Sequence, residues 1–152
     1  MPTKPTQSEY DGVAALRVAL RRFLHESDRI TRAHGLTPQR YDLLALIQGS
    51  TSTSPSIKEL AELLSLAPHS VTELVDRAED AGLVRRVEDN RDRRVARIAL
   101  TREGKARFDA ALIALRPERR LLLGLLRHVY AQAESLQTAE ATRPKRSTAK
   151  PR

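Results

Sequence analysis

The sequence predicts a mainly α-helical fold with one small β-hairpin. Along most of the chain apolar residues recur every three or four positions, the spacing of an amphipathic helix. Residues 82–104 are the exception, because they hold two short runs rich in Val, Ile and Leu, at 83–87 and 95–100. The segment between these runs, Glu-Asp-Asn-Arg-Asp-Arg-Arg, is too polar for a core and suits a turn. The two runs are therefore expected to pair as the strands of a hairpin.

The composition limits the class of protein. A chain of 152 residues that is 40% hydrophobic is large enough for one domain with a single core. The absence of Trp and the few Tyr and Phe argue against a surface that stacks single-stranded nucleic acid. The absence of Cys excludes disulfides, thiolate zinc sites and thiol-based sensing. Neither a signal peptide nor a membrane-spanning run is present, so we expect a cytoplasmic protein.

The charge points to a polyanionic partner. The net charge is +8 and the isoelectric point about 10.6. Several of these charges lie in residues 138–152, which are rich in Thr, Ala, Pro, Lys and Arg and are expected to form a disordered basic tail. The hairpin carries further Arg residues, whose guanidinium forks suit phosphate oxygens and narrow grooves. Asp89 and Asp92 are expected to brace it by holding neighbouring Arg side chains; alternatively, these charges only keep the hairpin soluble.

A helix-turn-helix pattern precedes the hairpin. Ser56 and Glu59 have the spacing of a capping box, which predicts that a helix begins after Ser56. The segment Ser-Leu-Ala at 65–67 is a candidate tight turn, and Pro68 is tolerated at the first position of the next helix. Two helices joined by so short a turn are typical of a helix-turn-helix.

The second helix of this pattern has one apolar and one polar side. If the polar side meets duplex DNA, the Ser70 and Thr72 side chains can form hydrogen bonds with base edges in the major groove. Glu73 can accept from a cytosine amino group, and Arg77 can reach a phosphate. The alternative is that Glu73 and Arg77 form a helix-stabilising pair four residues apart. The candidate contacts on this side are His69, Ser70, Thr72, Glu73 and Arg77.

Five short motifs occur in a fixed order between Ser56 and Gly104. They are Lys-Glu-Leu-Ala at 58–61, Ser-Val-Thr-Glu-Leu-Val-Asp-Arg at 70–77, Gly-Leu-Val at 82–84, Asp-Asn-Arg-Asp-Arg-Arg at 89–94 and Leu-Thr-Arg-Glu-Gly at 100–104. In this order the stretch resembles the winged helix-turn-helix of the MarR family of bacterial transcription regulators. The motifs cover roughly a third of the chain, and the flanking helices match more loosely.

The resemblance implies a single MarR-like domain over residues 8–137, after a flexible leader of residues 1–7. Residues 8–35 and 105–137 would be N- and C-terminal dimerisation helices around a winged helix-turn-helix of residues 37–104. The last helix is also richer in Leu than a lone surface helix requires. The candidate interface residues are Leu16, Leu20, Leu121, Leu122, Leu125 and Val129.

One departure from the family is an early proline. Pro117 interrupts the helix that begins after Thr101 and precedes the last, Leu-rich helix. The long helix that usually links the dimer interface to the DNA module is therefore expected to be split.

The resemblance further implies a homodimeric, nucleoid-associated repressor that binds an inverted repeat in double-stranded DNA and is relieved by a small aromatic or phenolic effector. The wing residues Arg91, Arg93 and Arg94 would contact DNA, with Arg91 in the minor groove. Two alternatives stay open: a ligand-independent architectural DNA-binding protein, and a winged-helix module for an acidic protein partner. The chain has no glycine-rich phosphate loop, no nucleophile elbow and no metal-ligand spacing among its His residues. No enzyme activity, cofactor or metal is therefore expected.

Overall fold

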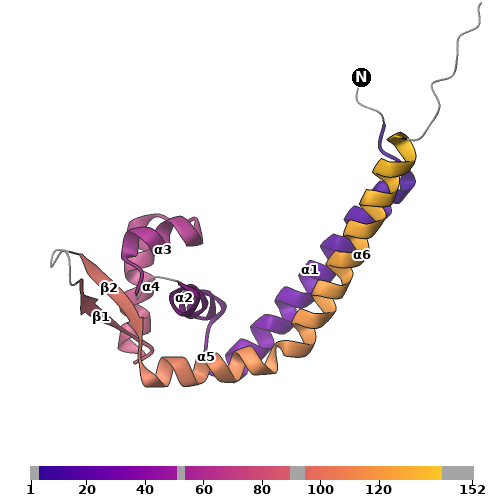
Figure 1. Ribbon diagram of the computed structural model, residues 1–152. Helices are drawn as coiled ribbons and strands as arrows, with labels where there is room; N and C mark the ends of the chain where they lie inside the picture. The colour runs from indigo at the N-terminus through magenta and orange to yellow at the C-terminus, as the bar shows by residue number, and fades with distance from the viewer. Residues whose placement is uncertain (1–3, 51–53, 90–94, 142–152) are drawn as a thin grey trace, which may run out of the picture. The chain divides into compact units, whose positions relative to one another are not determined.

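The computed structural model describes residues 4–50, 54–89 and 95–141, with side chains as far as His128. In these residues the chain is mainly helical with one two-stranded antiparallel sheet, which confirms the predicted fold class (Figure 1). The elements are α1 (Gln7–Ala33), α2 (Pro38–Gly49), α3 (Ile57–Leu64), α4 (Pro68–Asp80), β1 (Val84–Glu88), β2 (Ala96–Leu100), α5 (Arg102–Ala114) and α6 (Arg116–Ala141).

The helix ends follow local signals in the sequence. The Ser56 hydroxyl accepts from the Glu59 amide at 3.3 Å and the Glu59 carboxylate accepts from the Ser56 amide at 2.7 Å, so the predicted capping box is formed. Thr37 and Thr101 cap α2 and α5 in the same way, each accepting from an amide three residues ahead. Between α3 and α4 the backbone turns at Ser65, which has a left-handed φ of 54°.

Two helices extend further than the sequence suggested. α1 begins inside the expected leader because Thr6 and Glu9 form a reciprocal capping contact, with the Thr6 hydroxyl 3.3 Å from the Glu9 amide. α6 continues to Ala141, past the expected start of the tail at Thr138. Residues 138–141 contain two Ala and one Glu, which favour helix, and no Pro or Gly. The remainder of the tail lies outside the described residues.

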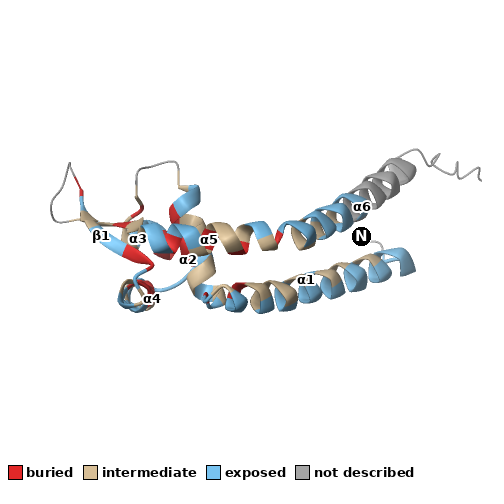
Figure 2. Cartoon of the chain, turned by 90° about the horizontal axis from the view of Figure 1, so that it is seen from below, coloured by how far each residue is buried: buried red, intermediate tan, exposed pale blue. Residues whose placement is uncertain are grey.

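The chain divides into two compact units. The first, Leu24–Pro117, is called the winged unit here because it holds the helix-turn-helix and the hairpin; the second, Met1–Phe23 with Glu118–Arg152, is called the helical unit. Buried residues concentrate in the winged unit, where α2, α3, α4, α5 and the hairpin enclose an aliphatic core (Figure 2). Core side chains with no exposed surface include Leu43, Leu44, Leu60, Val71, Val75, Leu83 and Ile98.

The hairpin is fixed to this core by its backbone as well as by its apolar face. Its register places Arg86 opposite Ile98, and the Ile98 amide donates to the Pro55 carbonyl at 2.9 Å. At its other end the first helical turn of α5 approaches the start of β1 closely. A Cβ at Gly104 would lie 1.9 Å from the Leu83 carbonyl oxygen, so only glycine fits there.

The helical unit keeps much of its apolar surface exposed. α5 ends at Ala114 and α6 begins at Arg116, so the helix break expected near Pro117 is confirmed. Beyond that break, Leu121 is 61% exposed and Leu125 is 41% exposed. Most of the first part of α1 is likewise exposed or half-buried.

Candidate nucleic-acid interface

The outward face of α4 collects polar side chains on a rigid base. Leu74, like Val71, Val75 and Ala78, anchors the helix in the core of the winged unit. On the opposite side His69, Glu73 and Arg77 are exposed, and Ser70 and Thr72 are half-buried. The helix begins at Pro68, so its first turn brings His69 and Ser70 to the end that follows the turn from α3. The structure therefore gathers all five predicted contact residues on one helix.

On this face Thr72 forms a hydrogen bond within its own helix, whereas the charged groups of Glu73 and Arg77 form no ion pair among the described residues. The Thr72 hydroxyl donates to the Pro68 carbonyl at 3.0 Å, so the oxygen lone pairs are left to accept from an amino group of a base. Glu73 and Arg77 form no ion pair within the described part of the chain, so the helix-stabilising pair considered from the sequence is not observed. Both charged groups remain available for a partner.

Arg86 of β1 joins the hairpin to α4. Its guanidinium donates to the Asp76 carboxylate at 2.5 Å and to the Glu79 carboxylate, and its backbone amide donates to Glu79 Oε1 at 3.1 Å. The hydrogen bond with Asp76 is the main reason that the pKa of Arg86 lies above its usual value. This side chain orients the hairpin against α4 and is occupied by the protein itself.

Arg97 of β2 holds the other side of the hairpin. It donates to the Asp89 carboxylate, to the Ser54 carbonyl at 3.0 Å and to the Glu59 carboxylate at 3.1 Å. The bond to Asp89, whose side chain is only 9% exposed, raises the pKa of Arg97. Hydrogen bonds from the Ser56 amide and hydroxyl lower the pKa of Glu59, and Arg97 lowers it further. One guanidinium thus links the turn end of the hairpin, at Asp89, to the start of α3.

These contacts divide the hairpin arginines by role. Arg86 and Arg97 form internal ion pairs, and nothing in the sequence distinguishes them from arginines that face a partner. Arg85 is exposed and pairs with no carboxylate in the described residues. The wing residues Arg91, Asp92, Arg93 and Arg94 lie outside the described residues.

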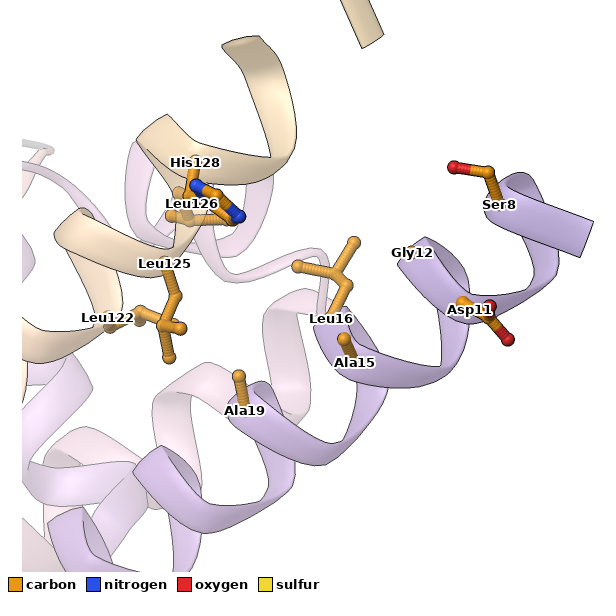
Figure 3. A pocket seen from close by; sticks show the side chains of 10 residues that line it. All are labelled: Ser8, Asp11, Gly12, Ala15, Leu16, Ala19, Leu122, Leu125, Leu126 and His128. Carbon is orange, nitrogen blue, oxygen red and sulfur yellow. The ribbon is translucent and has the colours of Figure 1, made fainter. Parts of the chain in front are cut away.

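The candidate dimer residues fall on the helical unit around a groove of about 370 Å³. In Figure 3, Leu122 and Leu125 of α6 point toward the side of α1 that carries Leu16 and Ala19. Leu20 and Leu121 do not line this groove but are exposed. The side chain of Val129 lies outside the described residues.

Comparison with known proteins identifies the family. The sequence profile of the MarR family matches residues 34–95, which run from the end of α1 to the start of β2. The chain is also 31% identical over 108 residues to the HTH-type transcriptional repressor MdtR of Bacillus subtilis, a match that covers 71% of this chain and 66% of MdtR. The chain belongs to the MarR family.

A second relative of this MarR protein is the transcriptional activatory protein BadR of Rhodopseudomonas palustris. It is 34% identical over 84 residues, which cover 54% of this chain and 48% of BadR. The matches thus span about half to two thirds of the length of these relatives. Both relatives are transcription regulators, not enzymes, in agreement with the expectation from the sequence.

Solved structures have the same fold. A MarR-family regulator from Rhodococcus sp. RHA1 is 25% identical, with a TM-score of 0.64 over 91% of this chain and 99% of that one. A mutant of S. aureus MepR bound to an oligodeoxyribonucleotide is 16% identical, with a TM-score of 0.61 over 92% of this chain and 100% of that one. At that identity the likeness to MepR concerns the fold alone.

Other kinds of site find no support among the described residues. They contain no cluster of three or more His, Cys, Asp or Glu side chains that would suit a metal ion. None of the helices they form is both long and apolar enough to cross a bilayer.

Proposed function

We propose that this MarR protein is a sequence-specific, double-stranded DNA-binding transcription regulator that acts as a homodimer. The observation that carries the proposal is the outward face of α4. Its charged and hydroxyl side chains are exposed or half-buried, and its opposite face is fixed in a closed core. A rigid helix with such a face suits insertion into the major groove.

In this proposal the start of α4 reads base edges. His69 and Ser70 lie nearest the end that enters the groove first. Thr72 presents acceptor lone pairs, and Glu73 is an acceptor with no competing ion pair among the described residues, so both suit amino groups of adenine or cytosine. Arg77, two turns further along, contacts a phosphate and fixes the register of the helix on the duplex.

The wing extends the contact beside the major groove. Arg91, Arg93 and Arg94 supply guanidinium groups, with Arg91 in the minor groove, where a narrow A·T-rich segment concentrates negative potential. Asp89 and Asp92 brace the wing. In support, Arg97 binds Asp89 where β1 ends and the turn begins, and Arg86 holds β1 against α4.

The exposed leucines of the helical unit support the proposed homodimer. A second copy would cover Leu121 and Leu125 and would present a second α4 related by a two-fold axis. The binding site would then be an inverted repeat with half-site centres about 10 base pairs apart. Repression relieved by a small aromatic or phenolic effector is the form of regulation we propose, as the relative MdtR is a repressor.

Selection of bound sequences from random duplex DNA tests this function. The expected product is an inverted repeat, and Glu73→Gln should change the preferred base at one position in each half-site. Glu62→Gln, which removes an exposed charge from α3, is the matched control and should leave the preference unchanged. Failure to enrich any sequence, or a single asymmetric element bound by a monomer, would contradict the proposal.

A further inference from the structure

A second basic feature lies beside α4, on the side that faces the start of α2. It is a cavity of about 520 Å³ within the winged unit. Three guanidinium groups line it, from Arg32 at the end of α1, Arg40 in α2 and Arg77 in α4, and no carboxylate does. Leu74, which is almost fully buried, supplies an apolar part of its wall. Three like charges around one hollow create a positive potential that favours the binding of an anion.

The cavity arginines differ from the hairpin arginines in their ion pairs. Arg86 and Arg97 each bind two carboxylates. By contrast, Arg32, Arg40 and Arg77 form no ion pair with any described residue. Arg40 Nη2 donates to the Arg77 carbonyl at 3.0 Å, which fixes the Arg40 side chain next to α4; its other guanidinium donors have no hydrogen-bond partner among the described residues.

The start of α2 adds little to this site through its backbone. Pro38 has no amide hydrogen, and the Arg40 amide already donates to the Thr37 hydroxyl at 3.3 Å. The anion affinity of the cavity therefore depends on the guanidinium groups, each of which presents a planar fork of donors that matches the oxygens of a phosphate.

We infer that the cavity holds a backbone phosphate of the bound DNA and that Arg32 and Arg40 are phosphate-binding residues. This inference rests on the proposed function. Arg77 is shared between the cavity and the DNA-facing side of α4, so an anion in the cavity lies next to the duplex that α4 reads. The volume exceeds that of one phosphate group, and Leu74 offers an apolar surface for the adjoining deoxyribose.

As a consequence, different residues provide the affinity for DNA and the choice of sequence. Arg32 and Arg40 come from elements outside the helix-turn-helix, α1 and α2, and they contact DNA only through its phosphates. Contacts of this kind fix the position of α4 on the duplex and add the same free energy on every sequence. They contribute affinity and salt dependence, whereas the choice of sequence belongs to residues 69–73.

The first test measures affinity as a function of salt for three variants. Arg32→Ala and Arg40→Ala should each reduce the slope of log K against log salt by about one, and each should weaken a selected duplex and a random duplex by the same factor. Arg22→Ala is the matched control, because it removes an exposed guanidinium from α1 ten residues before Arg32. It should leave the slope unchanged.

The second test locates the phosphate. Single backbone phosphates of the selected duplex are replaced in turn by neutral methylphosphonate. At one position per half-site the replacement should weaken the wild-type protein more than the Arg32→Ala variant, because that variant has already lost one of the three guanidinium groups that line the cavity. If every replacement affects both proteins equally, or if the salt slope of Arg32→Ala equals that of the wild type, the cavity does not bind DNA. If the wild-type protein binds no duplex at all, the proposed function fails first.

Discussion

The two units of this MarR protein use the same aliphatic residues and differ in how far they bury them. In the winged unit Leu44 and Leu60 have no exposed surface and belong to a core of buried residues that partly buried side chains surround. In the helical unit Leu121 and Leu123 are more than half exposed on a helix that contains no described buried residue. Exposed apolar surface of this kind is characteristic of a face that a partner covers.

This difference indicates that a single chain completes the apolar core of the winged unit but leaves apolar surface of the helical unit uncovered. Burial of apolar area stabilises a fold at about 25 cal/mol per Å², so the winged unit gains its stability from its own chain. The helical unit only half-buries residues such as Leu16 and Leu122, so it gains more of this energy when something covers its exposed leucines. Stability of the winged unit should therefore be independent of protein concentration, whereas that of the helical unit should depend on it.

The largest expected effect comes from a cavity in the closed core. Leu44→Ala removes a fully buried side chain of α2 and should lower the free energy of unfolding by about 2–5 kcal/mol, because the surrounding helices cannot collapse into the space. Chemical denaturation monitored by circular dichroism measures this loss in the free energy of unfolding. The loss should be equal at low and high protein concentration, and a loss that vanishes at high concentration would place Leu44 under a partner instead.

The second-largest effect should be a change in the oligomeric state of the protein. Leu125→Glu places a charge in the groove of the helical unit and should convert the dimer to a monomer, because a charge buried without a partner is costly. Light scattering coupled to size exclusion gives the mass. Leu63→Glu is the control, since Leu63 is 58% exposed on α3 of the winged unit, and it should remain dimeric. A stable Leu125→Glu dimer would show that the interface lies elsewhere.

The helices and their ends could be predicted from sequence because the signals are local. The Ser56 capping box, the Thr37 cap and the break near Pro117 all depend on residues within four positions of one another. Thr6 and Glu9 have the same capping-box spacing, so the start of α1 is also defined by a local signal. The side of α4 that faces away from the core was likewise readable, since helical periodicity defines it.

The roles of the hairpin arginines could not be predicted, because they depend on contacts between distant residues. Arg97 meets Glu59, 38 positions earlier, and Arg86 meets Asp76 in another element. Sequence alone presents both as positive charges on a strand, no different from Arg85. The cavity shared by Arg32, Arg40 and Arg77 is invisible for the same reason, because three separate helices contribute to it.

The third prediction separates the internal arginines from the exposed one. Arg97→Ala removes hydrogen bonds to Asp89, Glu59 and the Ser54 carbonyl and should lower the free energy of unfolding by about 1–3 kcal/mol, since the Asp89 carboxylate is nearly buried. Arg85→Ala removes an exposed charge from the paired strand and should leave stability within about 0.5 kcal/mol of the wild type. Thermal unfolding of both variants measures the contrast. Equal melting temperatures would show that the Arg97 contacts add no stability.

The smallest expected effect is the pH dependence of folding stability that Glu59 contributes. Hydrogen bonds from Ser56, with a further contribution from Arg97, hold the pKa of Glu59 below its ordinary value. A carboxyl whose folded-state pKa is depressed stabilises the fold fully above its unfolded-state pKa and loses that contribution as the pH falls through the folded-state pKa. Glu59→Gln should therefore be less stable than the wild type at neutral pH, and the difference should shrink to zero in acid. Because Glu59 is about half exposed, solvent screening keeps the difference below about 1 kcal/mol.

Melting temperatures of the wild type and Glu59→Gln between neutral pH and strongly acidic pH test this directly. Glu62→Gln is the matched control on the same helix, since Glu62 is exposed and pairs with no described residue. Its difference from the wild type should stay near zero throughout. A Glu59→Gln difference that persists below the carboxylate range would show that the side chain stabilises α3 by packing, and that its charge on Arg97 and on the Ser56 amide contributes nothing.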